Sequence, residues 1–403
     1  MWLFLEPLDV VLFRDSKPFT AGESFWARST FPPSPLPFMG ALRAKLLVEQ
    51  GVDPEVYKRA VTGRSKGLPK LIDRIGGPHD YGRLRLTGPF LAQKRGSRLV
   101  PYFPAPLDLR VLEGEPAGFL RPRPFPWPLT WNPPTLTPLW TTEAGDEAKG
   151  KMMDAQRLML DAQHLKYYLE GKPVTPTDGR ELWEGEIRVG IELSGRRTAE
   201  EGKLYTLEFI RLNSRPTAPL GFLLKVTGLE GLKLPGRGLL ALGGESRGAG
   251  YEEVSDEALA EDFWRLIQGE TLKVRLKGQR RFKLYLATPG LFRKGWVPDC
   301  LQEQNGQYVG QIDSLRIRLV AAAVSKAVAV GGWDLVHNRP RPLRRAVPAG
   351  SVYFLEKVDG PLDDADVQRL LDAFHFQSLS SAEDGQAGFG LALLGVCPEG
   401  DRV

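Results

Sequence analysis

Residues that bind metals or form disulfides are scarce in this sequence. Among 403 residues there are only two cysteines and four histidines. Cys300 and Cys397 have no CxxC spacing and the histidines are scattered, so we expect no disulfide framework, no metal and no cofactor. The longest apolar stretch, residues 317–333, is interrupted by Arg318, Ser325 and Lys326. It is too polar to cross a membrane, and we expect no membrane partner.

We also do not expect the N-terminal residues to be an export signal. The N-terminal residues have no basic segment before their apolar run, and they include Glu6, Pro7 and Asp9. This pattern predicts a first strand over residues 2–13 and a cytoplasmic protein. The length is ample for two domains of ordinary size, each with its own apolar core.

Positive charge is present in excess and is clustered. The net charge is +5. Eight Lys or Arg and no acid lie between Glu270 and Asp299, and further acid-free windows cover residues 58–70, 83–98 and 339–345. Clustering of this kind favours a polyanion partner. Within "TLKVRLKGQRRFKLYL" we expect a strand with Lys273, Arg275 and Lys277 on its solvent face.

The pattern of apolar residues predicts an α+β fold with two domains, residues 1–255 and 256–403. In the first we expect a helix over 34–50, a hairpin joined by "KRGS" and an amphipathic helix over 151–170. A Pro- and aromatic-rich insertion occupies residues 101–140. In the second, strands surround a helix in "DADVQRLLDAFH". Strands alternating with helices in each half indicate a duplicated split βαβ arrangement.

The glycine-rich stretch "LGGESRGAG", residues 242–250, admits two catalytic interpretations, and both fail. Ser246 fits G-x-S-x-G, but no helix pattern follows it, as a nucleophile elbow requires. Gly243 and Gly248 have phosphate-loop spacing, yet Ala249 and Gly250 replace the required Lys and Ser/Thr. What remains is a loop whose backbone N–H groups can bind an anion, with a tight turn as the structural alternative. A second glycine cluster lies at 388–390.

Several motifs occur together in an order typical of one protein family. They are "DVVLFRDSKPF", "PSPLPFMGALR", "YFPAPLDL", "RVGIELSGRRTAEEGKLYTLEF", "LGGESRGAG", "RPLRRAVPAGSVYF" and "GFGLALLG". Through them the chain resembles the RAMP proteins of CRISPR systems, specifically the family of the third subunit of the type III-B (Cmr) effector complex. The resemblance covers nearly the whole chain.

The resemblance implies two ferredoxin-like, RRM-related domains of βαββαβ order and a non-catalytic role. Such a subunit binds the 5′ tag of the crRNA, docks the large Palm-containing subunit and contacts neighbouring RAMP subunits. The family's glycine loops fall on Gly243–Gly250 and Gly388–Gly390, and the helix after the first strand carries Gly40 and Arg43. The expected RNA-binding residues are Arg14, Lys17, Arg43, Gly243, Gly244, Arg247, Gly248, Gly250, Arg341, Arg344, Arg345, Gly388, Phe389 and Gly390.

Proteins bind single-stranded RNA through both cations and aromatic rings. The aromatic residues expected to stack on bases here are Phe25, Trp26 and Phe389. The alternative for Phe25 and Phe389 is a place in the core, and for Arg43 an ion pair within the fold.

Two other functions stay open. Some RAMP relatives cleave repeat RNA with a histidine, and His79 in "GGPHDYG" is the candidate here, although the sequence shows no second catalytic group for it. A protein scaffold that does not contact RNA is the third possibility.

Overall fold

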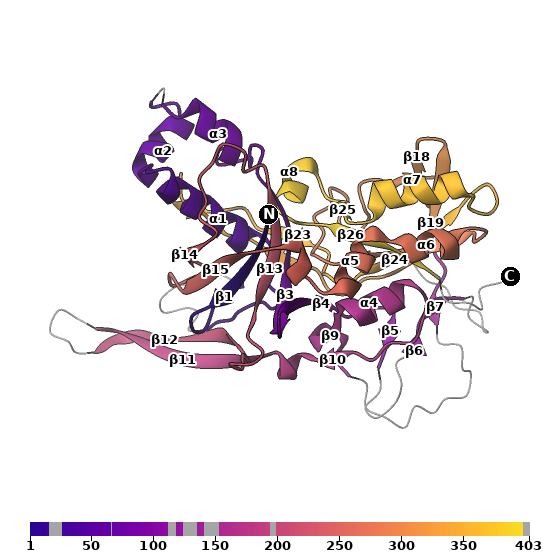
Figure 1. The fold of residues 1–403 in the computed structure, drawn as a ribbon, viewed down its shortest axis with the longest axis horizontal. Coiled ribbons are helices and arrows are strands. Elements are labelled where there is room, and N and C mark those ends of the chain that lie inside the picture. Colours follow the sequence, from indigo (N-terminus) through magenta and orange to yellow (C-terminus); the bar gives the residue numbers. More distant parts are fainter. Residues whose placement is uncertain are drawn as a thin grey trace.

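The structure, a computed structural model, describes residues 1–15, 26–65, 67–111, 118–123, 135–140, 153–193 and 199–397. Two large antiparallel sheets organise these residues (Figure 1). In spatial order the first contains β10 (Thr177–Asp178), β9 (Leu158–Asp161), β4 (Arg98–Pro104), β3 (Arg85–Arg95), β13 (Leu220–Thr227), β1 (Trp2–Pro7), β15 (Gly248–Val254) and β14 (Arg237–Ala241). The second contains β17 (Gln302–Gln304), β18 (Gln307–Ile312), β19 (Leu315–Ala323), β24 (Val352–Lys357), β16 (Arg281–Leu286), β26 (Leu391–Val396) and β25 (Gln377–Ser378).

Helices appear where the sequence supplies start and stop signals. Helix α1 (Leu36–Glu49) begins beside Pro35, whose fixed φ suits a first turn, and ends before Gly51, which has φ +67°. Helix α7 (Asp364–Phe374) begins with a capping box formed by Asp363 and Asp366. Both helices, and the β3–β4 hairpin, confirm the sequence prediction. The other helices are α2 (Pro54–Val61), α3 (Pro69–Ile75), α4 (Ala162–Leu169), α5 (Glu261–Gln268), α6 (Glu270–Leu276) and α8 (Ala382–Gln386).

Three predicted elements were wrong in type or length. The helix expected over 151–170 is strand β9 followed by the shorter helix α4, because residues 159–161 pair with β4. The strand expected to carry Lys273, Arg275 and Lys277 is helix α6, which buries Leu272 and Leu276 one turn apart. The first strand ends at Pro7 rather than at Phe13. Of the Pro- and aromatic-rich insertion expected over 101–140, residues 101–104 belong to strand β4 of the first sheet, and residues 112–117 and 124–134 lie outside the described residues.

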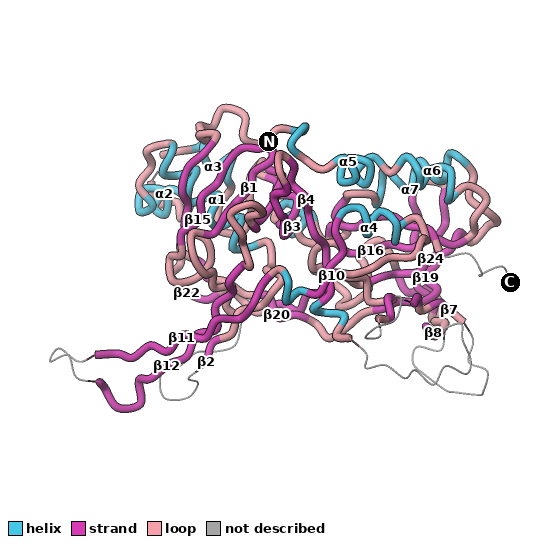
Figure 2. The backbone as a smooth tube through the Cα atoms, turned by 60° about the horizontal axis from the view of Figure 1, so that its bottom comes forward, coloured by secondary structure: helices cyan, strands magenta, loops and turns pink. Residues whose placement is uncertain are grey.

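A long two-stranded ribbon extends away from the rest of the molecule (Figure 2). It consists of β11 (Trp183–Leu193) and β12 (Ala199–Leu212), and the short strand β2 (Trp26–Ala27) pairs with β12 in parallel. At its base, Val11 and Ile210 exchange backbone hydrogen bonds of 2.9 and 2.8 Å. The chain after β1 is therefore held against the ribbon.

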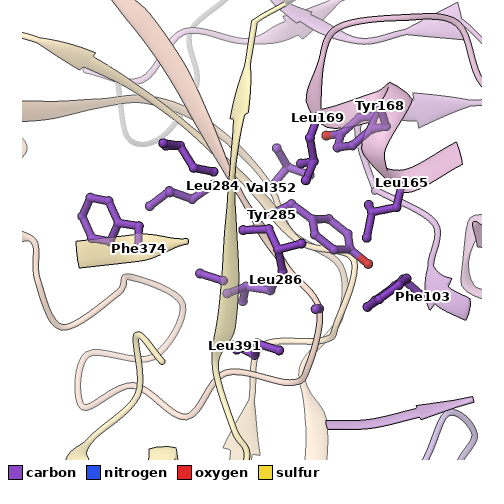
Figure 3. Close-up of a cluster of buried hydrophobic side chains, with 14 of the residues drawn as sticks. Phe103, Leu165, Tyr168, Leu169, Leu284, Tyr285, Leu286, Val352, Phe374 and Leu391 are labelled. Atoms are coloured by element: carbon purple, nitrogen blue, oxygen red, sulfur yellow. The ribbon is translucent and has the colours of Figure 1, made fainter. Parts of the chain in front are cut away.

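One apolar core joins elements of both large sheets. Figure 3 shows Leu165 and Tyr168 of α4, with Phe103 of β4, packed on the side of β16 that carries Tyr285. The Tyr285 hydroxyl donates to the Pro104 carbonyl at 2.6 Å. Helix α4, which directly follows strand β9 of the first sheet, thus also packs on the second.

A buried ion pair lies in this core. Lys283 of β16 is 0% exposed and its Nζ lies 3.7 Å from Oδ2 of Asp108, which is also 0% exposed. Its ammonium group also lies over the Tyr168 ring, 3.4 Å from the centroid, and the Tyr168 hydroxyl donates to Asp108 at 2.7 Å. Burial lowers the pKa of Lys283 and raises that of Asp108, while the opposite charge of each works against the shift.

Four short two-stranded sheets complete the described fold. They pair β20 (Val328–Val330) with β23 (Arg344–Ala346), β21 (Trp333–Asp334) with β22 (Arg339–Pro340), β5 (Leu109–Arg110) with β6 (Gly118–Phe119), and β7 (Arg121–Pro122) with β8 (Leu139–Trp140). No described helix is long and apolar enough to cross a membrane.

Candidate nucleic-acid interface

The first glycine cluster forms a tight loop between β14 and β15. Gly243 has φ +78°, and a Cβ there would lie 2.5 Å from the Leu12 carbonyl oxygen, so only glycine fits. The Gly244 N–H donates to that carbonyl at 2.8 Å, and the Leu242 N–H donates to the Arg247 carbonyl at 2.7 Å. The loop is therefore fixed against the chain that follows β1.

The loop leaves backbone donors exposed at its tip. Glu245 and Ser246 have φ +56° and +48°, and both are exposed. Among the described residues, none accepts a hydrogen bond from the backbone N–H of either one. Strand β15 begins at Gly248, so a strand rather than a helix follows Ser246. The loop thus offers two amides to an anion and lacks the helix of a nucleophile elbow.

Five charged side chains meet beside this loop, at the base of the ribbon; we call them the Asp9 cluster. Asp9 accepts from Arg188 at 3.0 Å and from Arg211 at 3.1 Å. Glu186 accepts from the same two guanidiniums, at 2.7 and 2.5 Å. The fifth member, Arg247, brings its Nη1 to 3.9 Å from Asp9.

Arg247 is held mainly by an aromatic ring. Its guanidinium carbon lies 4.6 Å from the centroid of Phe209, and that of Arg188 lies 5.3 Å from the same ring. Hydrogen bonds from Arg188 keep the pKa of Asp9 below its usual value, and those from Arg211 do the same for Glu186. Both carboxyls are therefore ionised at neutral pH.

Arg43, expected to bind RNA, has its guanidinium occupied within the fold. Its Nη2 donates to the Tyr57 hydroxyl at 2.7 Å and to the Gly77 carbonyl at 2.6 Å. The same guanidinium stacks on Tyr81 at 5.5 Å. Arg43 thereby fixes the loop at residues 76–82 rather than extending into solvent.

The expected second cationic rim is also largely engaged. Arg341 donates to the Pro78 carbonyl at 3.4 Å, across the boundary between the two halves of the sequence. Arg344 makes a two-fold hydrogen bond to Asp384, at 2.7 and 2.5 Å. Arg345, on the same strand, is exposed. Of these three arginines it is the one whose side chain forms neither a hydrogen bond nor an ion pair with another described residue.

The second glycine cluster serves close packing between the sheets. Gly388 has φ +103°, and a Cβ there would lie 2.6 Å from the carbonyl oxygen of Gly88 on β3. Phe389 is 0% exposed and packs in the core, so its ring cannot stack on a base in this conformation. Gly390 holds the turn beside Ser380. The two glycine clusters therefore lie in different surroundings and do not form one paired site.

The remaining predicted residues lie beside the ribbon or outside the described chain. Arg14 is exposed and forms a backbone bridge with Ser29. Trp26 is 46% exposed, and the Arg28 guanidinium lies 5.1 Å from its ring centroid. Lys17 and Phe25 lie outside the described residues.

Two histidines from distant parts of the sequence lie side by side, which the sequence did not predict. The ring centroids of His79 and His337 are 6.1 Å apart with an interplanar angle of 25°. Nδ1 of His337 is 2.7 Å from Oδ2 of Asp334. His375, by contrast, is buried away from this pair. No group of three or more His, Cys, Asp or Glu within the described ranges could hold a metal ion.

The Asp9 cluster was missed, although the hairpin alternation contained a signal for it. Glu186 and Arg188 share one face of β11, and Arg211 lies on the same face of the paired β12 beside Phe209. Nothing in the sequence places Asp9 or Arg247 there, because only the folded chain brings them to the ribbon.

Comparison with known proteins matches nearly the whole sequence to a family model. A sequence model of the family described as CRISPR-associated protein (Cas_Cmr3) matches residues 3–397. A chain from the type III-B Cmr-beta complex bound to cognate target RNA and AMPPnP is 15% identical, with a TM-score of 0.43, over 88% of this chain and 86% of that one. A chain from the complex bound to cognate target RNA is 14% identical, with a TM-score of 0.43, over 89% and 86%. Curated protein sequences give no significant match.

Proposed function

The chain belongs to the family of CRISPR-associated proteins described as Cas_Cmr3, and from this premise we propose that it is a non-catalytic, RNA-binding subunit of a type III-B effector complex. In that role it anchors the 5′ tag of the crRNA and docks the large Palm-containing subunit beside neighbouring RAMP subunits. The observation that carries the RNA-binding part is the glycine loop, whose exposed amides lie beside Arg247.

We also propose that each large sheet contains a ferredoxin-like core. The strand orders β3-β13-β1-β15 and β19-β24-β16-β26 are those of a βαββαβ unit, with the first and third strands adjacent at the centre. Each unit keeps one of its two connecting helices in the described chain, α1 in the first and α7 in the second. This support is topological and adds to the resemblance read from the sequence.

The RNA-binding role is tested by fluorescence anisotropy with a labelled RNA that carries a repeat-derived 5′ tag. We expect binding that weakens steeply with salt, because phosphate contacts release counterions. Arg345→Gln should weaken binding, whereas Arg265→Gln, which removes the same charge from α5, should not. Copurification of the co-expressed large subunit tests the docking role. Salt-independent binding would contradict the proposal.

One observation favours RNA cleavage as a second candidate. The adjacent rings of His79 and His337, with Asp334 orienting the latter, supply two groups able to exchange protons. One could remove the proton of a 2′-hydroxyl while the other protonates the departing 5′-oxygen, which leaves a 2′,3′-cyclic phosphate. Site-specific cuts in repeat RNA that disappear in both His79→Ala and His337→Ala would support this candidate. Intact RNA after incubation with the purified chain supports the non-catalytic role.

A further inference from the structure

The Asp9 cluster has a charge that its own members do not balance. Three guanidiniums and two carboxylates meet there, which leaves a net charge of +1. We propose that this cluster is a subsite for one phosphate of the RNA backbone, with Arg247 as the residue that contacts it. The inference rests on the proposed RNA-binding function and assigns one contact within it. A phosphodiester carries a single negative charge and would neutralise the set.

Arg247 is the member with unused donors. Arg188 and Arg211 each bond both carboxylates, whereas the closest approach of Arg247 to a carboxylate is 3.9 Å. Its Nε is buried and has no hydrogen-bond partner. The Phe209 ring fixes the plane of the guanidinium without using its N–H groups. An arginine held in this way is preorganised for a phosphate oxygen.

The glycine loop adds main-chain donors at the same place. Arg247 follows Glu245 and Ser246 directly, and the amides of these two residues have no acceptor among the described residues. Gly243 and Gly244 keep the loop against Leu12, so its position relative to Arg247 is fixed. Unpaired amides next to an arginine in one glycine-rich loop are a common arrangement for phosphate binding.

A purely structural role explains the cluster less well. Its side chains are between 28% and 45% exposed, and exposed ion pairs contribute little to stability. The ribbon is already attached by the backbone bonds between Val11 and Ile210. The ion pairs that Arg188 and Arg211 form with the two carboxylates would be enough to attach the ribbon to the chain after β1. The fifth member, Arg247, is incompletely paired, and a cation with unused hydrogen-bond donors is what an anionic ligand requires.

Charge variants of the purified full-length chain test the proposal, again with the labelled tag RNA. Asp9→Asn raises the net charge of the cluster to +2, so we expect about threefold tighter binding. The slope of log affinity against log salt concentration should stay the same, because the number of bound phosphates does not change. Glu186→Gln should act in the same direction. Arg247→Gln should weaken binding about tenfold and reduce the slope by about 0.7. Glu261→Gln, which frees Arg265 on α5, is the matched control and should change neither quantity.

The direction of the effects separates the possible failures. If wild type binds RNA but both carboxylate variants weaken binding, the cluster is a structural fastening and the proposal is overturned. An unchanged salt slope in Arg247→Gln also overturns it. If wild type does not bind the tag RNA at any salt concentration, the proposed function itself fails, and this inference fails with it.

Discussion

Replacing His375 should remove an acid-sensitive contribution to the stability of the second sheet. The side chain is 7% exposed between α5 and β26. Its Nδ1 accepts from the Leu394 N–H at 3.2 Å, so Nε2 must carry the proton donated to the Leu266 carbonyl at 2.7 Å. Both ring nitrogens are occupied in the neutral form. Burial lowers the pKa of His375 to about 4.

The size of the effect follows from that pKa. An unfolded histidine titrates near pH 6.5, so at pH 5 its protonation stabilises the unfolded chain by about 2 kcal/mol. The folded chain gains almost nothing at pH 5, because its His375 takes up a proton only near pH 4. The contribution is therefore complete above about pH 6.5 and is lost as the pH falls towards 4.

Urea unfolding at pH 7.5 and pH 5.0 measures this loss in wild type and in His375→Gln. The variant should be less stable at both values because it loses packing and hydrogen bonds. The decrease between the two values should, however, be smaller in the variant by about 2 kcal/mol. Comparing the two proteins cancels the other titrating groups. An equal decrease in both would refute the assignment of a neutral, buried His375.

Three further predictions concern other features. Lys283→Met leaves the Asp108 carboxylate buried and should cost about 3–5 kcal/mol in urea unfolding, most of it recovered by adding Asp108→Asn. Equal stability of the single and double variants would contradict a charged pair. Gly388→Ala should lower the midpoint of thermal unfolding more than Gly278→Ala, since both have positive φ but only the former meets a carbonyl. Trp26→Ala should weaken tag-RNA binding by about 1–3 kcal/mol in anisotropy if its exposed ring stacks on a base.

The sequence predicted those elements whose signals are local. Pro35 and Gly51 delimit α1, and the capping residue Asp363 begins α7. Between such signals the 3.6-residue spacing of apolar side chains can be assigned to a helix with known ends. The apolar residues in segments 158–161 and 270–276 fit both the 3.6-residue spacing of a helix and the two-residue alternation of a strand. Pairing of β9 with β4 and burial of one side of α6 decide between them, and both depend on distant residues.

The candidate site was predictable only in part, for a similar reason. The glycine loop and Arg247 are adjacent in sequence, and their composition alone indicates an anion site. Asp9, Glu186 and Arg211 are far apart in sequence, and only the strand pairing and the bridge at Val11 bring them together. For Arg43 and Arg344 the sequence predicted free RNA-binding cations, but in the fold both guanidiniums donate to acceptors within the protein. A cluster of basic residues in the sequence does not reveal such acceptors.

The position of α4 on the second sheet has a mechanical consequence. Since apolar side chains of α4 and β4 interlock with those of β16, swinging one large sheet relative to the other would expose tightly packed aromatic surface to water. Rotation of this kind would cost considerable free energy, whereas two domains joined only by a flexible linker could rotate at little cost. The protein should therefore behave as one rigid unit, with a constant separation between the glycine loop beside the first sheet and helix α7 on the second.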